Sequence, residues 1–142
     1  YVSEDGLSLV ATERDVPVAE PIVAQARRIV EAQLGAAPAP LASAIPAGTT
    51  LRSLFMTERG DAFVDLSAEV TSKHPGGALN ELFTVYAIVD ALTVNLPAIT
   101  RVQILVNGRE SDTLAGHVDL RHPLQKNLKW LANPASPPAE TR

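Results

Sequence analysis

The 142-residue chain contains no cysteine, and only 4% of its residues are aromatic. The lack of cysteine excludes disulfides, thiolate nucleophiles and metal sites built on sulfur. No apolar run approaches the roughly 18 residues that a membrane-spanning helix needs. Basic residues are dispersed, with Arg27 and Arg28 as the only adjacent pair, and the net charge is −4. A nucleic-acid partner is therefore excluded, because phosphate binding requires clustered Lys and Arg.

The remaining composition is that of a globular protein, with 46% hydrophobic and 20% charged residues. We predict a single domain over residues 1–131, because the segment before the Pro-rich stretch 36–48 is too small to bury an apolar face alone. Residues 132–142, with three prolines, read as a linker or disordered tail. The chain begins at Tyr1, so we expect a processed piece of a longer protein.

Hydrophobic periodicity and turn residues predict an α+β fold. We expect a mostly antiparallel sheet of about four to five strands, with two helices packed on one face. One helix begins at Pro21 and ends before Gly35, and a longer one spans residues 78–96. The predicted strands are a short one within 7–12, followed by 49–57, 62–66, 101–106 and 114–120.

The long helix carries a broad apolar stripe. Because Val85 and Ile88 lie off this stripe, we expect the helix to pack on the sheet and partly on its neighbour. Asn80 and Glu81 favour the positive end of the helix dipole. The stripe consists of Leu79, Leu82, Phe83, Tyr86, Val89, Leu92 and Leu96.

Catalytic motifs with a known mechanism, such as a Walker loop or H-E-x-x-H, are absent. His117 and Asp119 form an H-x-D pair that would face one side of the predicted strand 114–120. Together with His74 or His122, the pair could form a zinc or general-base site. The simpler interpretation is that His117 is a hydrogen-bonded residue at a sheet edge.

Two further features allow a chemical and a structural interpretation. Asp65 and Asp119 could pair as carboxylates for acid/base work, or each could cap a turn. Gly76 and Gly77 precede the long helix, where exposed amides could hold an anion. The more economical interpretation is that these glycines let the chain turn into the helix.

Trp130 is the only tryptophan and lies near the end of the predicted domain. It could anchor a partner protein, as aromatic side chains often do in interfaces. Alternatively, it covers the edge of the core.

The chain resembles the GerMN domain, the sporulation and spore germination module. The resemblance is carried by AFVDLS, by GGALNE at the start of the long helix, by VDALTVNLPAITRVQILVNGRE and by GHVDL. The helix at Pro21 and the run SAIPAGTTLRSLFMT are similar to the first half of such a module. The resemblance covers Tyr1 to about Leu124, and the segment after Trp130 does not look like a second copy.

The resemblance implies a non-enzymatic domain of the bacterial cell envelope, often part of a membrane-anchored lipoprotein. It brings no catalytic residues and no cofactor, and it implies structural roles for five positions, namely Gly76, Gly77, Glu81, Gly108 and Gly116. We expect protein–protein interaction or scaffolding, with other envelope proteins or a second copy as partner. The membrane would be reached only through an anchor outside this chain.

The surface that we expect to be involved includes Asp65, Gly76, Gly77, His117, Asp119 and Trp130. Strand 114–120 and the N-terminal strand are the predicted sheet edges. One alternative is a module that binds a cell-wall glycan or peptide, that is, peptidoglycan, in a groove near Gly76, Gly77, Asp65 and His117. Another is a hydrolase that uses His117 and Asp119.

Overall fold

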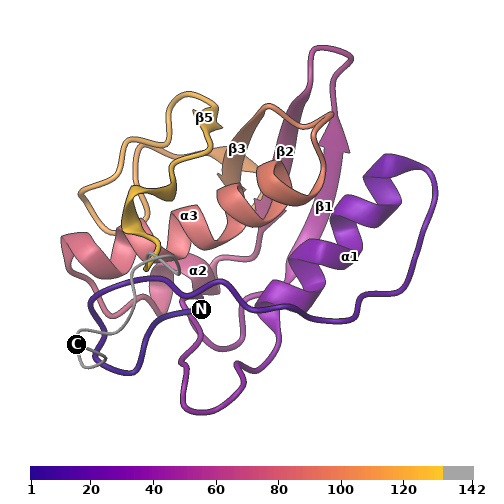
Figure 1. Ribbon diagram of the computed structural model, residues 1–142. Coiled ribbons are helices and arrows are strands. Elements are labelled where there is room, and N and C mark those ends of the chain that lie inside the picture. Colours follow the sequence, from indigo (N-terminus) through magenta and orange to yellow (C-terminus); the bar gives the residue numbers. More distant parts are fainter. Residues whose placement is uncertain (133–142) are drawn as a thin grey trace.

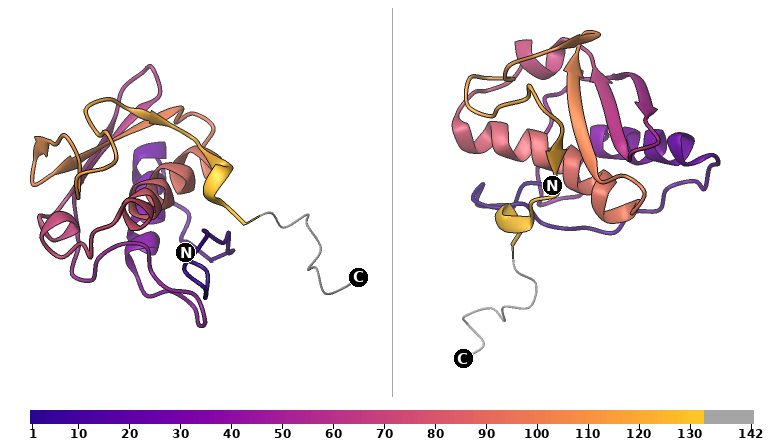
Figure 2. Two further views of the ribbon diagram at one scale, coloured as in Figure 1. Left: turned by 90° about the vertical axis from the view of Figure 1, so that its left-hand side faces the viewer. Right: turned by 90° about the horizontal axis from the view of Figure 1, so that it is seen from above.

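The computed structural model describes residues 1–132 and shows two layers. Helices α1 (Ile22–Leu34) and α3 (Ala78–Asn95) lie on one face of a five-stranded sheet (Figures 1 and 2). The other layer is the sheet itself, whose second face carries no helix of comparable length within residues 1–132. The predicted α+β fold with two helices on one face is therefore confirmed.

The sheet has the order β1-β2-β3-β4, and β5 pairs with the first two residues of β3. Strands β2 and β3 are parallel and are joined by a crossover through the short helix α2 and through α3. All other pairings are antiparallel, so the sheet is mostly antiparallel as predicted. The elements are β1 (Leu51–Met56), β2 (Asp61–Leu66), α2 (Glu69–Ser72), β3 (Arg101–Val106), β4 (Arg109–Glu110), β5 (Leu124–Gln125) and the 3-10 helix η1 (Leu128–Trp130).

Two glycine turns fix the register of the sheet. Asn107 and Gly108 join β3 to β4 with φ of 54° and 81°, the positive values that a tight hairpin turn requires. Gly60 closes the β1–β2 hairpin with φ of 93°, and a Cβ atom there would lie 2.8 Å from the Ala98 carbonyl oxygen. The Thr100 N–H donates to the Gly60 carbonyl at 2.8 Å. Gly60 therefore allows the hairpin to dock against the segment that leads into β3.

The main core lies between the sheet and the two helices. Alternate residues of β2, namely Ala62, Val64 and Leu66, are fully buried toward the helices. On α3, Val85 and Ile88, which lie off the predicted stripe, are fully buried, whereas several members of the stripe are only partly buried. The reason is that α3 is covered on two sides. Phe83 and Ala87 face a second cluster that includes Leu9 and Ala44.

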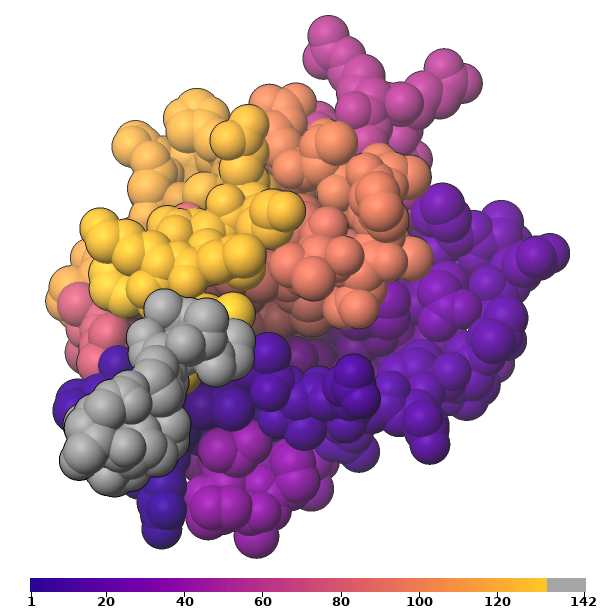
Figure 3. Space-filling view, viewed as in Figure 1, coloured from indigo at the N-terminus to yellow at the C-terminus, as the bar shows by residue number. Residues whose placement is uncertain are grey.

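The two terminal segments lie side by side and cover α3 (Figure 3). The Leu9 N–H donates to the Trp130 carbonyl at 2.9 Å, and the Ala132 N–H donates to the Leu9 carbonyl at 2.7 Å. The predicted N-terminal strand is present only as isolated bridges, in which Val2 pairs with Leu9 and Ala42, and Leu9 pairs with Leu131. The predicted linker lies almost wholly beyond residue 132, outside the described residues.

The prediction of a strand over residues 114–120 was wrong. This segment is irregular, and the last strand of the sheet is β5, at Leu124–Gln125. The backbone N–H groups at the start of this segment bond to a side chain of α3 and not to a neighbouring strand. That side chain is Glu81.

Candidate functional site

Glu81 lies in the first turn of α3 and is completely buried. Its carboxylate accepts hydrogen bonds from the backbone N–H groups of Leu114 and Ala115, both at 2.9 Å, and of His117 at 2.8 Å. The start of α3 thereby holds the loop between β4 and β5. From the sequence we expected Glu81 to favour the helix dipole, and the resemblance implied a structural role for it, but neither predicted the bonds to this loop. The sequence signal available was an acidic residue within an otherwise apolar helix face.

The three backbone donors explain how a carboxylate can be buried at this position. Burial raises the pKa of Glu81, but the hydrogen bonds from the loop N–H groups outweigh burial and hold the pKa below its ordinary value. Glu81 is therefore ionised at neutral pH. The His117 Nδ1 atom lies 3.2 Å from the same carboxylate, while about half of the His117 side chain is exposed.

The H-x-D pattern suggested that His117 and Asp119 form one site, but in the structure the two side chains contact different partners. His117 contacts Glu81, whereas Asp119 accepts two hydrogen bonds from the Arg121 guanidinium, at 3.0 and 3.1 Å. The bonds from Arg121 lower the pKa of Asp119 to about 2. Within residues 1–132 there is also no group of three or more His, Asp or Glu side chains placed to hold a metal ion.

Gly76 and Gly77 enter α3 with φ of 86° and 91°, a conformation that favours glycine. The Gly76 N–H donates to His74 Nδ1 at 3.0 Å, so His74 Nε2 carries the proton and donates to Thr84 Oγ1 at 2.9 Å. The Thr84 hydroxyl donates in turn to the Ala44 carbonyl at 2.6 Å. Burial lowers the pKa of His74, although the nearby Glu81 charge opposes this effect. The Gly76 amide is thus occupied within the chain.

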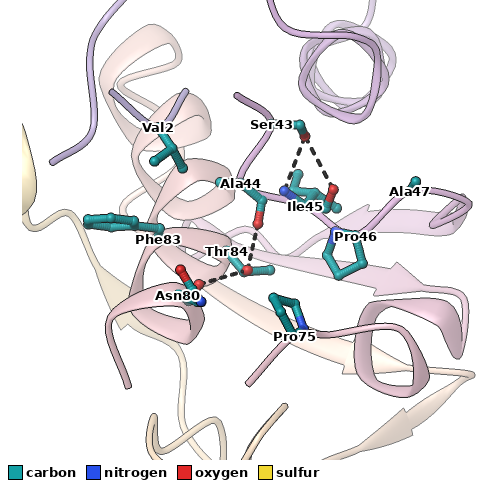
Figure 4. Close-up of a pocket in the computed structure, with 10 residues that line it drawn as sticks. All are labelled: Val2, Ser43, Ala44, Ile45, Pro46, Ala47, Pro75, Asn80, Phe83 and Thr84. Carbon is teal, nitrogen blue, oxygen red and sulfur yellow. Dashed lines mark hydrogen bonds between the residues drawn. The ribbon is translucent and has the colours of Figure 1, made fainter. Parts of the chain in front are cut away.

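A depression of about 330 Å³ lies beside this hydrogen-bonded chain (Figure 4). Its polar groups bond to one another: the Thr84 hydroxyl donates to Ala44, and the Ser43 hydroxyl bonds to the backbone of Ile45. The depression therefore offers shape and apolar contact more than polar recognition. It is lined by Val2, Ser43, Ala44, Ile45, Pro46, Ala47, Pro75, Asn80, Phe83 and Thr84.

Asp65 lies near the end of β2 and caps the β3–β4 turn. Its carboxylate accepts the Gly108 N–H at 2.8 Å and lies 3.8 Å from Arg52 Nη1. The same Arg52 nitrogen donates to the Asn107 side-chain oxygen at 3.1 Å. The contacts of Asp65 and of Asp119 are thus with different partners, which agrees with the turn-capping interpretation of Asp65.

Trp130 in η1 packs against the second cluster, which contains Leu9 and Phe83. Its indole N–H is buried and has no hydrogen-bond partner within the described residues. Trp130 thus covers the edge of the core, one of its two predicted roles. Its use as an anchor for a partner remains a prediction.

The helix-free face of the sheet carries a feature that the sequence interpretation missed. The rings of Phe55 on β1 and Phe63 on β2 stack with centroids 4.9 Å apart and planes 10° apart. Phe55 is nevertheless 49% exposed. Because Ala62, Val64 and Leu66 point inward, alternation along β2 sends Phe63 outward, and pairing with β1 adds Phe55. Within the described residues, β1 has no strand on its outer side.

The fold and these contacts define a small α+β domain. The polar groups at the start of α3 bond to one another, and the exposed Phe55 stacks on Phe63 at the edge of the sheet. Residues 1–112 match the model of the family described as "Germane: Sporulation and spore germination", and the chain belongs to this family. The family assignment agrees with the resemblance to the GerMN domain. No curated protein matches the sequence.

Solved structures share the fold at low sequence identity. The first GerMN domain of the sporulation protein GerM from Bacillus subtilis has a TM-score of 0.71 and 21% identity, over 87% of this chain and 92% of that one. The tandem GerMN domains of the same protein give 0.67 and 22%, over 89% of this chain and 43% of that one. A Clostridium perfringens structure named "Putative Lipoprotein" gives 0.66 and 22%, over 82% and 80%.

Among residues 1–132, no helix is both long and apolar enough to cross a membrane.

Proposed function

We propose that this chain is a non-catalytic domain of a bacterial envelope protein that binds another protein through β1 and the helix-free face of the sheet. The observation that carries the proposal is the stacking of Phe55 on Phe63, in which Phe55 stays 49% exposed beside an unpaired strand edge. The extracytoplasmic location and a membrane anchor outside this chain are supported by its family and by the names of similar structures.

Strand geometry supports the choice of β1. The Thr57 N–H donates to the Asp61 carbonyl. Because hydrogen-bonding residues alternate along an antiparallel pair, the backbone N–H and C=O groups of Phe55 point toward β2, and those of Leu54 and Met56 point outward. Outward backbone groups can template a further strand, and neighbouring apolar side chains add affinity. Beyond β3, in contrast, β4 and β5 are only two residues long.

The proposed binding edge, β1, differs from the edges predicted from the sequence, which were strand 114–120 and the N-terminal strand. Segment 114–120 is held by Glu81, and the N-terminal segment forms only isolated bridges. The alternative of peptidoglycan binding near Gly76, Asp65 and His117 has less support, because polar groups at all three positions bond within the chain.

The test uses the full-length protein in its native envelope. A photo-crosslinking amino acid at Thr57, which is exposed at the hairpin, should capture a protein partner, and Phe55→Ser should abolish this capture. Val94→Ser is the matched control, since Val94 is 51% exposed but lies at the end of α3. Equal capture by the wild type and by Phe55→Ser would contradict the proposal. Amide shifts at Gly76 and His117 on titration with peptidoglycan fragments would favour the alternative.

A further inference from the structure

We infer that residues 1–10 form a detachable strap, which leaves the rest of the molecule as one unit while the sheet, α1 and α3 stay folded. The inference is independent of the proposed function, because no hydrogen bond among the described residues joins the strap to β1. Three features carry it. The strap lies between two other segments, it has no hydrogen bond to α3 or to the sheet, and the two flanking segments are attached to α3 separately.

The strap lies between the segment at Ala42 and the segment at Leu131. Val2 pairs antiparallel with Ala42, and Leu9 pairs parallel with Leu131. On the first side, the Val2 N–H donates to the Ala42 carbonyl at 2.8 Å, and the Ala42 N–H donates back at 3.0 Å. On the second side, Leu9 makes two backbone bonds with the residues that flank Leu131. The strap thus fills a slot between two extended segments.

The contact between the strap and α3 is apolar. Val2 and Leu9 pack in the second cluster with Phe83, which is only 1% exposed (Figure 4). Within residues 1–132, no hydrogen bond joins the strap to α3 or to the five-stranded sheet. A region held by few directional bonds opens at a lower free energy than the central strands and helices of a domain. The strap is therefore the part of the described chain that we expect to open first.

The connection from the strap to α1 can follow such a movement. Residues 11–20 form no helix or strand, and most of them are exposed. One further tie has to break, because Arg14 donates to the Tyr1 hydroxyl and, at 2.9 Å, to the Ala36 carbonyl. Arg14 is itself exposed, so water can replace these partners at little cost.

The two flanking segments keep their own attachments to α3. The Thr84 hydroxyl donates to the Ala44 carbonyl at 2.6 Å, and the Asp90 carboxylate accepts the Asn127 N–H at 3.0 Å. Departure of the strap therefore leaves an open slot, with unpaired backbone groups along both walls. Such a slot fits an extended segment, and in the structure the strap itself occupies it.

Native-state hydrogen exchange of the full chain tests the inference. The N–H groups that bond across the two sides of the strap belong to Val2, Leu9, Ala42 and Ala132. When closing is faster than exchange, these four amides should exchange at least about tenfold faster than the amides of β2 and β3. Equal protection would mean that they exchange only when the whole domain unfolds, and the strap would not be detachable.

A core variant separates detachment of the strap from unfolding of the domain. Ile104→Val, at a buried site of β3, should speed exchange of the β2 and β3 amides about three- to tenfold. It should leave the four strap amides unchanged, because the strap opens without the core. Leu9→Ala should speed these four amides at least about tenfold. If Ile104→Val accelerated the strap amides as much as those of β2 and β3, strap and core would be one cooperative unit and the inference would be wrong.

A disulfide tests whether the strap moves as one unit. The chain contains no cysteine, and a residue pair that exchanges two backbone bonds, as Val2 and Ala42 do, has a Cα separation of about 5.5 Å, which a disulfide can bridge. In the double variant Val2→Cys with Ala42→Cys, oxidation should slow exchange at Leu9 and Ala132, on the other side of the strap, at least about tenfold. Equal exchange at Leu9 and Ala132 in the oxidised and reduced forms would show that the two sides open separately, which would overturn the inference.

Discussion

The start of α3 and the β1 edge distribute their polar groups in opposite ways. Around Glu81, a buried carboxylate meets three backbone N–H groups, and His74 connects Gly76 to Thr84. At β1, outward backbone groups have no neighbouring strand within the described residues, and an aromatic ring is half exposed. The residues that look chemically active in the sequence are thus used for internal support. The residues free to bind look ordinary.

This difference has a general physical basis. A buried polar group that lacks a partner is costly, so a folded chain uses its buried carboxylates and imidazoles to satisfy loops. An exposed strand edge incurs little cost in water and remains available for association. The following changes test whether the two regions differ in stability and in binding as this account requires.

Removing the Glu81 carboxylate should have the largest effect. Glu81→Ala leaves three loop N–H groups without an acceptor, and we expect a loss of about 3–5 kcal/mol in unfolding free energy. Urea unfolding followed by circular dichroism measures this loss. Glu31→Ala, at an exposed position of α1, is the control and should change stability by less than about 0.5 kcal/mol. A similar small change for Glu81→Ala would contradict the structural role of the carboxylate.

Gly60→Ala should have the next largest effect, because it acts on the hairpin that carries β1. The added Cβ would meet the Ala98 carbonyl oxygen at 2.8 Å, in a backbone with φ of 93°. We expect a loss of about 2–4 kcal/mol from the clash and the strained conformation together. Gly6→Ala also has positive φ, but its Cβ would meet no atom within 4 Å. This control should cost only about 1 kcal/mol, so equal losses would refute the close approach.

The sequence predicted the fold well where a local pattern matched the final environment. The helix after Pro21, the hairpin at Gly60 and the turn at Asn107 follow from local propensities and appear in the structure. The strand 114–120 failed because its loose alternation could not reveal that a side chain of α3 would take its N–H groups. Sequence also could not show that Phe55 and Phe63 stack, because their contact depends on strand register.

The hydrogen bonds of His74 predict a pH dependence at the start of α3. Burial lowers the pKa of His74 from 6.5, so its stabilising contribution is complete above pH 6.5 and is lost as the pH falls below that value. Protonation would place a second N–H against the Gly76 amide. His74→Asn should therefore cost about 1–2 kcal/mol at pH 8 and flatten the acid loss of stability.

The His74 measurement requires a background without Asp90. Burial raises the pKa of Asp90 to about 6, so its ionisation destabilises the fold above that pH, and protonation relieves this cost as the pH falls. Its effect is thus opposite in sign to that of His74. Melting curves between pH 4 and 8 should therefore be compared between Asp90→Asn and the double variant with His74→Asn. Their difference gives the His74 contribution, because Glu81 and the Tyr1 amino group, whose pKa values are also lowered, titrate in both. His122→Gln, at an exposed site, should leave this difference unchanged. An acid loss of equal size in the two variants would show that a group other than His74 causes it.

Replacing Phe55 should have the smallest effect on stability, and this outcome bears most directly on the difference between the two regions. Because the ring is 49% exposed, Phe55→Ser forfeits mainly the stacking on Phe63, worth about 0.5–1.5 kcal/mol. Phe83→Ala, at a buried site of α3, should cost about 3–5 kcal/mol. Unfolding at low protein concentration keeps association from adding to either value. If Phe55→Ser proved as destabilising as Phe83→Ala, the aromatic pair would be part of the core, and its exposure would no longer argue for a partner.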